Sequence, residues 1–136
     1  MPDNTLISSD PAILDREWIV RSVLGSYWGG HLKPEQVLAA LDESVVWGAY
    51  EDTTQIGFIR AVTDGAVFSS ITDVFVSESH RGKGVGSALM DAVIRDPRIA
   101  NTICILQARP AAQLWYRHWA FRVIDPVHGI CQRMPT

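Results

Sequence analysis

The chain of 136 residues lacks the features of several protein classes. Its two cysteines, Cys104 and Cys131, have the spacing of neither a metal-binding pair nor a disulfide framework. The four histidines are scattered, so no metal site is expected. No apolar run approaches the ~18 residues that a membrane span requires. The polar, acidic start of the sequence is unlike a secretory signal. These absences predict a cytoplasmic protein with no metal and no membrane partner.

Basic residues are fewer than acidic residues. Lysine and arginine together number 12 against 15 aspartates and glutamates, which gives a formal net charge of −3 at pH 7. A protein that binds nucleic acid by neutralising phosphates needs a basic excess, so no nucleic-acid partner is expected. The negative charge is compatible with a cationic amine ligand.

What the sequence does contain is typical of one folded domain. Hydrophobic residues make up 47% and charged residues 20%, and no linker or repeat divides residues 1–136. Hydrophobic periodicity predicts helices over 14–24, 34–41, 87–95 and 110–119, the first preceded by a helix-starting Asp10-Pro11 pair. It predicts strands over 5–9, 45–50, 55–62, 67–76, 102–106, 121–124 and 130–132. One strand–helix–strand crossover inside an otherwise antiparallel meander predicts an α+β domain.

A glycine-rich loop between a strand and a helix is the segment that carries chemistry. The strand is expected to end at Val76, and the helix is expected to begin near Gly84. Glycines let the backbone approach a ligand, and the first amides of a helix attract anions. Arg81 and Lys83 add positive charge. The loop therefore favours a phosphate or pyrophosphate ligand, although a purely structural role for these glycines remains open.

Two familiar phosphate-binding patterns are absent from this loop. The pattern G-x4-G-K-[ST] would need a Lys-Ser or Lys-Thr pair, and none follows Gly82. The pattern G-x-G-x-x-G fails because Ser87 and Leu89 stand where the last glycine should be. A nucleotide-phosphate binder on an unrelated fold stays open at this point.

Two motifs resemble those of the GCN5-related N-acetyltransferase (GNAT) family. The pattern Arg81-x-x-Gly84-x-Gly86 is similar to the family's R/Q-x-x-G-x-G/A motif, which binds the pyrophosphate of acetyl-coenzyme A (acetyl-CoA). About 30 residues downstream, the segment 112–121 resembles A-x-x-L-Y-x-x-x-G-F on the family's last helix. It departs from that pattern at Ala120, where the family usually has glycine.

The resemblance implies a GNAT-like fold and acetyl-CoA as cosubstrate. The fold has a mixed, mostly antiparallel sheet of six to seven strands with four helices, and its central strands, here 67–76 and 102–106, splay apart at the cofactor site. Small members are often dimers, so a homodimer is a further expectation. By the same resemblance, acetyl-CoA contacts are expected from Val74, Phe75, Val76, Arg81, Gly82, Lys83, Gly84, Val85, Gly86, Ser87, Gln107, Ala112 and Trp115.

The activity that the resemblance implies is acetyl transfer from acetyl-CoA to a primary amine of a small molecule, or of a protein or peptide. The amine would attack the thioester directly. Tyr116 matches the family's proton donor to the leaving thiolate, and a phenol with a reference pKa of ~10 is protonated at neutral pH. Asp73 could deprotonate or bind the amine, or satisfy backbone groups. A water held by Ser70, Thr72 or Asp73 is an equally compatible base.

The remaining aromatic residues admit two interpretations. Tyr27 and Trp28 lie in a glycine-rich loop, where they would either line the acceptor pocket or cap the core. Trp47, Trp115, Trp119 and the thiol of Cys104 are expected in the core. A second function also stays open, in which the same fold serves as a non-catalytic acetyl-CoA-binding sensor or subunit.

Overall fold

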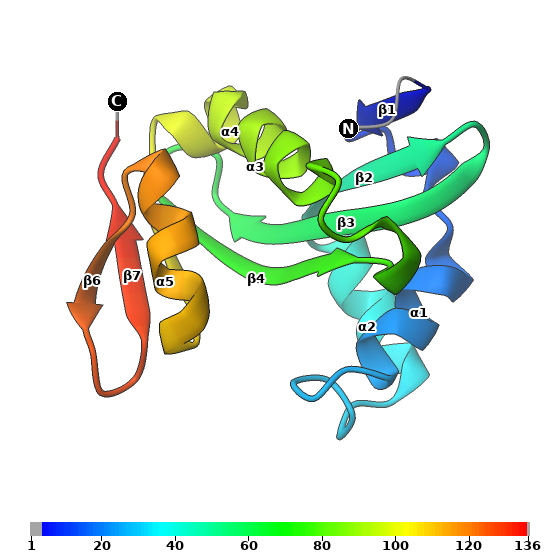
Figure 1. Ribbon diagram of the computed structural model, residues 1–136, viewed down its shortest axis with the longest axis horizontal. Helices are drawn as coiled ribbons and strands as arrows, with labels where there is room; N and C mark the ends of the chain where they lie inside the picture. Colours follow the sequence, from blue (N-terminus) through cyan, green and yellow to red (C-terminus); the bar gives the residue numbers. More distant parts are fainter. Residues whose placement is uncertain (1–3, 136) are drawn as a thin grey trace.

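Figure 1 shows the computed structural model, which describes residues 4–135. The strands are β1 (Thr5–Ser8), β2 (Val45–Glu51), β3 (Thr54–Thr63), β4 (Phe68–Val76), β5 (Ile103–Gln107), β6 (Arg122–Asp125) and β7 (Ile130–Arg133). The α-helices are α1 (Arg16–Leu24), α2 (Pro34–Asp42), α3 (Val85–Arg95), α4 (Pro97–Ala100) and α5 (Pro110–Tyr116). Single 3-10 turns occupy Pro11–Ile13, Glu78–His80 and Arg117–Trp119. No helix in the described part of the chain is long and apolar enough to cross a membrane.

The strands form one seven-stranded sheet in the order β1-β2-β3-β4-β5-β7-β6. Every neighbouring pair is antiparallel except β4 and β5, which are parallel. The helix α3 makes the crossover between these two strands, as expected for a parallel pair. The predicted α+β class and mostly antiparallel sheet are therefore confirmed.

Two hydrophobic cores lie on opposite faces of this sheet (Figure 1). The larger core packs α3, α4 and α5 on one face and includes Leu89, Ile99 and Tyr116. The smaller core packs α1 and α2 on the other face, around Ile19 and Phe58. Each strand alternates its side chains between these faces, which is why apolar residues occur on both sides of the central strands.

The helices depart from prediction at two aspartate–proline steps. Asp10-Pro11 begins only a 3-10 turn, and α1 begins at Arg16, where the Asp15 carboxylate accepts a hydrogen bond from the amide of Trp18. Asp96 ends α3 as expected, but its side chain also caps α4 by accepting from the amide of Arg98. The prediction of four helices was therefore one short, because a four-residue helix is too brief to show periodicity.

The second motif ends as the family pattern would require, despite its alanine. Ala120 adopts a left-handed conformation with φ of 67° after the last 3-10 turn. This conformation normally favours glycine, which explains the family's preference at this position.

The three tryptophans expected in the core do not all lie there. Trp47 and Trp119 are buried, whereas Trp115 is 37% exposed, so its assignment to the core was wrong.

Candidate active site

The site begins where the two parallel strands stop pairing. Phe68, Ser69 and Ser70 of β4 pair with residues 103–105 of β5, and no pairing continues beyond them. The remainder of β4 stays bonded to β3 through Val76. One edge of β4 is therefore left without a strand partner in the middle of the sheet, which is the predicted splay.

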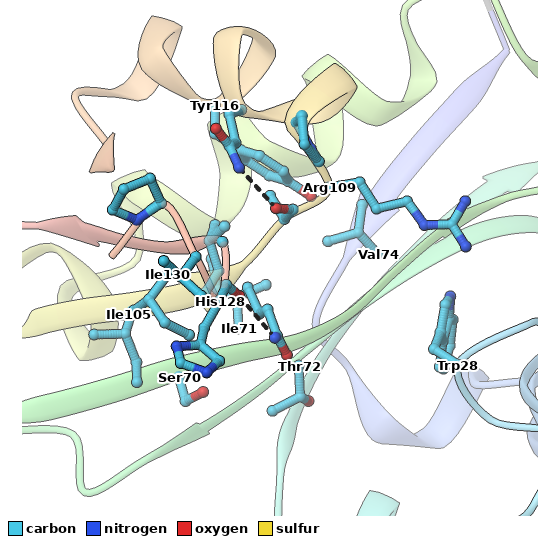
Figure 2. A pocket seen from close by; sticks show the side chains of 18 of the residues that line it. Trp28, Ser70, Ile71, Thr72, Val74, Ile105, Arg109, Tyr116, His128 and Ile130 are labelled. Carbon is cyan, nitrogen blue, oxygen red and sulfur yellow. Dashed lines mark hydrogen bonds between the residues drawn. The ribbon is translucent and has the colours of Figure 1, made fainter. Parts of the chain in front are cut away.

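A cavity of about 720 Å³ opens at this splay. Its walls come from β4, from β5 and the segment after it, from α5, from the β6–β7 turn, and from the loop between α1 and α2. Figure 2 shows Ser70 and His128 on one side of this cavity and Trp28 and Arg109 on the other. Elements from both ends of the chain thus meet around the unpaired edge of β4.

A second cavity of about 380 Å³ lies beside the glycine-rich loop. Val74 lines both cavities, so the two adjoin along β4. Gly82 and Gly84 have φ of 75° and 83°, which leads the chain from the strand into α3. No side chain caps α3, so its first amides are not satisfied by a capping group. The arrangement is suited to an anion.

Arg81 is fixed beside this second cavity. Its Nε donates a hydrogen bond of 2.9 Å to the carbonyl oxygen of Val76, and its guanidinium lies 5.7 Å from the centre of the Phe75 ring. The rest of the guanidinium can donate to a ligand, because Arg81 also lines the cavity. Lys83 is outside the lining of both cavities.

Most residues predicted to contact the cofactor line one of the two cavities. They are Val74, Val76, Arg81, Gly82, Gly84, Val85, Gly86, Ser87, Gln107 and Trp115. Phe75, Lys83 and Ala112 do not line either. The Phe75 ring packs against Trp18 and Phe58 on the opposite face of the sheet, so only its backbone remains available on β4.

Tyr116 enters the large cavity from α5 (Figure 2). Its side chain packs edge-on against Trp115 and Phe121, with ring centres 4.9 and 6.0 Å away, and it is 8% exposed. Burial, with smaller contributions from Cys131 and Tyr27, raises the pKa of Tyr116 to about 12. The phenol therefore keeps its proton at neutral pH and can donate it into the cavity.

The structure does not bring Asp73 into this cavity. Its carboxylate accepts a hydrogen bond of 2.6 Å from Nε of Arg60, and Arg60 also donates to the Ser44 hydroxyl at the end of α2. Both side chains of the ion pair are largely buried, at 11% exposed for Asp73 and 17% for Arg60. Asp73 is missing from the cavity lining, whereas Val74 beside it is present. Because neighbouring side chains on a strand point to opposite faces, this placement favours the structural alternative for Asp73 over the expected catalytic role.

The loop between α1 and α2 reaches the large cavity. Tyr27 and Trp28 both line it, and Trp28 also packs against the smaller core. Gly29 holds the loop close to α1, because a Cβ there would lie 2.4 Å from the carbonyl oxygen of Val23. The Ser26 hydroxyl tightens the same turn by donating to that carbonyl and accepting from the amide of Gly29.

The sequence analysis missed two lining residues that have ionisable side chains. The guanidinium carbon of Arg109 lies 3.3 Å from the centre of the Tyr27 ring, and both residues line the cavity. His128 lies in the β6–β7 turn, and its Nδ1 is 2.9 Å from a carboxylate oxygen of Asp125. Local patterns could not reveal either residue, because loops distant in sequence place them in the cavity.

Two other expected groups can be placed directly. Cys104 is completely buried in β5, and burial raises the pKa of its thiol to about 11, which makes it a core residue rather than a nucleophile. Within residues 4–135, no group of three or more His, Cys, Asp or Glu side chains is arranged to hold a metal ion.

Comparison with known proteins gives consistent results. A family model described as an acetyltransferase (GNAT) domain matches residues 42–123. A crystallised protein from Xanthomonas campestris pv. campestris, described as belonging to the GNAT family, is 33% identical, with a TM-score of 0.80 over 88% of this chain and 84% of that one. The chloroplastic GCN5-related N-acetyltransferase 1 of Arabidopsis thaliana is 34% identical over 62% of this chain and 43% of its own length.

A GNAT family acetyltransferase from Brucella melitensis, crystallised with acetyl-CoA, shares the fold. Its TM-score is 0.72 at 18% identity, over 96% of this chain and 87% of that one. The present chain spans about half the length of the curated relatives it matches.

Proposed function

We propose that this chain, which belongs to the acetyltransferase (GNAT) family, transfers an acetyl group from acetyl-CoA to a primary amine. The unpaired edge of β4 between two adjoining cavities carries the proposal. One cavity offers helix amides and Arg81, and the other offers a buried phenol. That combination suits a long ligand with an anionic part and a reactive end.

The residues around the two cavities fit acetyl-CoA. The amides that begin α3, together with Arg81, would hold the pyrophosphate. The backbone of β4 from Val74 to Val76 would bond to the amides of the pantetheine arm in the way that an added strand bonds to a sheet edge. Acetyl-CoA supplies the thioester that an amine attacks.

Tyr116 is the proton donor in this proposal. Transfer forms a bond between the amine nitrogen and the acetyl carbon and breaks the bond between that carbon and sulfur. The departing thiolate takes a proton from the phenol of Tyr116, whose raised pKa keeps it protonated until that moment.

His128 is the proton acceptor that the cavity favours. The ionisable side chains among its described lining residues are those of Tyr27, Arg109, Tyr116 and His128. Of these, only the imidazole has a ring nitrogen that can act as a general base toward an amine. Asp125 binds Nδ1 of His128 and leaves Nε2 to accept the proton from the amine. A water held by Ser70 and Thr72, which line the same cavity, is the alternative carrier.

One pair of variants tests cofactor binding. Gly84→Asp places a carboxylate at the proposed pyrophosphate site, and Gly84→Asn is its neutral control, because both side chains meet the same left-handed backbone. Calorimetry should show that Gly84→Asp weakens acetyl-CoA binding far more than Gly84→Asn does. Equal affinities in the two folded variants would overturn the placement of the pyrophosphate.

Tyr116→Phe then separates an enzyme from an acetyl-CoA sensor with the same fold. Amine-dependent thiol release should fall roughly ten- to a thousandfold, with acetyl-CoA affinity little changed. Acetyl-CoA binding by the wild type without thiol release for any amine would favour the sensor.

A further inference from the structure

The charges around the large cavity limit the kind of amine that it can accept. No aspartate or glutamate is among the described residues that line it, whereas Arg109 is. Two acidic residues that adjoin lining residues in the sequence are already paired, Asp73 with Arg60 and Asp125 with His128. A cationic or polycationic acceptor would find no free carboxylate in the cavity wall and would meet the charge of Arg109.

Arg109 is held in place but left without an acidic partner. It directly precedes Pro110, which begins α5, and its guanidinium carbon lies over the Tyr27 ring, 3.3 Å from the ring centre. No hydrogen bond or ion pair joins this guanidinium to another group in the described part of the chain. Contact with a ring face uses none of the N–H donors, so those of Arg109 are available to a ligand. A planar group that presents two donors side by side matches a carboxylate.

We propose that the acceptor is an amine that also carries a carboxylate, such as an amino acid, and that Arg109 binds this carboxylate. The proposal rests on the proposed function, because it concerns the acceptor of the same reaction. A single guanidinium suits a singly charged carboxylate better than a phosphate dianion, because the described residues that line the cavity include no second arginine or lysine. Trp28 and Tyr27 would flank the apolar part of the acceptor.

The position of Arg109 also orients the acceptor. Arg109 and Trp28 lie across the cavity from His128 and Ser70 (Figure 2). A carboxylate on Arg109 would leave the amine of the same molecule to extend across the cavity, toward Tyr116 and His128. The distance between amine and carboxylate becomes a specificity determinant.

The test uses acceptors that differ only in their carboxylate. The twenty L-amino acids, and 3-aminopropanoate, 4-aminobutanoate and 6-aminohexanoate, are compared with the corresponding carboxamides in the thiol-release assay. The best acid should exceed its carboxamide about ten- to hundredfold in kcat/KM, because a charged hydrogen-bonded pair is lost. Added salt should lower kcat/KM for the acid more than for the carboxamide.

Arg109→Gln should remove this preference by raising KM for the acid about ten- to hundredfold while leaving the carboxamide unchanged. Arg117→Gln is the matched control. It removes the same charge from an exposed arginine, and Arg117 does not line the cavity. Tyr27→Phe should retain the preference, and Tyr27→Ala should weaken it, since only the latter removes the stacked ring.

The outcomes distinguish this inference from the proposed function. Acetylation of carboxamides as efficiently as acids, with no effect of Arg109→Gln, would overturn the inference and leave acetyl transfer standing. Thiol release with neither of these classes but with other primary amines would overturn the inference alone, whereas no release with any amine would overturn both. A preference for acids that survives Arg109→Gln would place the carboxylate on another residue.

Discussion

Asp73→Asn tests whether the Asp73–Arg60 ion pair serves stability or catalysis. The substitution keeps the shape of the side chain and removes its charge. It leaves the Arg60 guanidinium, 17% exposed, without the negative charge that lies 2.6 Å from its Nε. Breaking a buried pair costs ~3–5 kcal/mol and an exposed pair ~0–1 kcal/mol, so this largely buried pair should cost about 2–3 kcal/mol.

The expected change in melting temperature follows from the size of the chain. A protein of 136 residues has an unfolding entropy of about 0.3 kcal/mol per degree, so the loss corresponds to a fall in Tm of about 7–10 °C. At 20 °C, where the variant is still folded, kcat and KM should stay within about twofold of the wild type, since Asp73 does not line the cavity.

A double-mutant cycle sharpens the test. Arg60→Gln combined with Asp73→Asn removes both charges, so the double variant should lose clearly less stability than the sum of the two single variants. Thermal unfolding followed by circular dichroism and steady-state kinetics on the same preparations provide the data. A kcat for Asp73→Asn that falls more than tenfold, with a Tm within about 2 °C of the wild type, would refute the reasoning and return Asp73 to the reaction.

Three further predictions concern other parts of the site. His128→Gln should lower kcat about ten- to hundredfold, whereas His118→Gln, outside the cavity lining, should leave kcat unchanged in steady-state assays. Burial raises the pKa of Tyr50 and Tyr116 to about 12 from 10.0, so the folded state holds these protons more tightly than the unfolded state does. The free energy of unfolding should therefore be steady below pH 10 and fall between pH 10 and 12. Melting curves at pH 9 and pH 11 measure this difference. Gly129→Ala should cost about 1–3 kcal/mol in denaturant unfolding, because φ is 69° and the new Cβ would lie 2.3 Å from the carbonyl oxygen of Ala108; an unchanged midpoint would contradict the backbone geometry.

The glycine-rich loop could be predicted from sequence because its determinants are local. The strand ending at Val76, the left-handed glycines at 82 and 84, and the helix that follows are consecutive in the chain. Alternation along β4 also indicates where the side chain of Asp73 lies. If Val74 faces the cavity, Asp73 must face the opposite side of the sheet.

The partners of the cavity residues could not be predicted in the same way. Arg60 meets Asp73 only because the β3–β4 register shifts between Arg60 and Ala61, and no local pattern encodes that irregularity. Arg109 meets Tyr27 across 82 positions of the sequence through two loops. Such contacts depend on how the finished sheet and its helices bring distant loops together.

The short pairing between β4 and β5 has a mechanical consequence. The sheet consists of two halves, β1–β4 and β5–β7, which are joined by a seam of three residue pairs. At the paired end, the buried hydroxyls of Ser69 and Thr102 lie 2.7 Å apart, and Thr102 also donates to the carbonyl oxygen of Ile99. These hydrogen bonds hold the two halves together at the paired end, whereas at the other end no strand pairing joins them. A ligand bound along β4 would bond to this unpaired edge of the strand. Amide hydrogens on that edge should therefore exchange quickly in the free protein and slowly in the complex, even though the strand lies at the centre of the sheet.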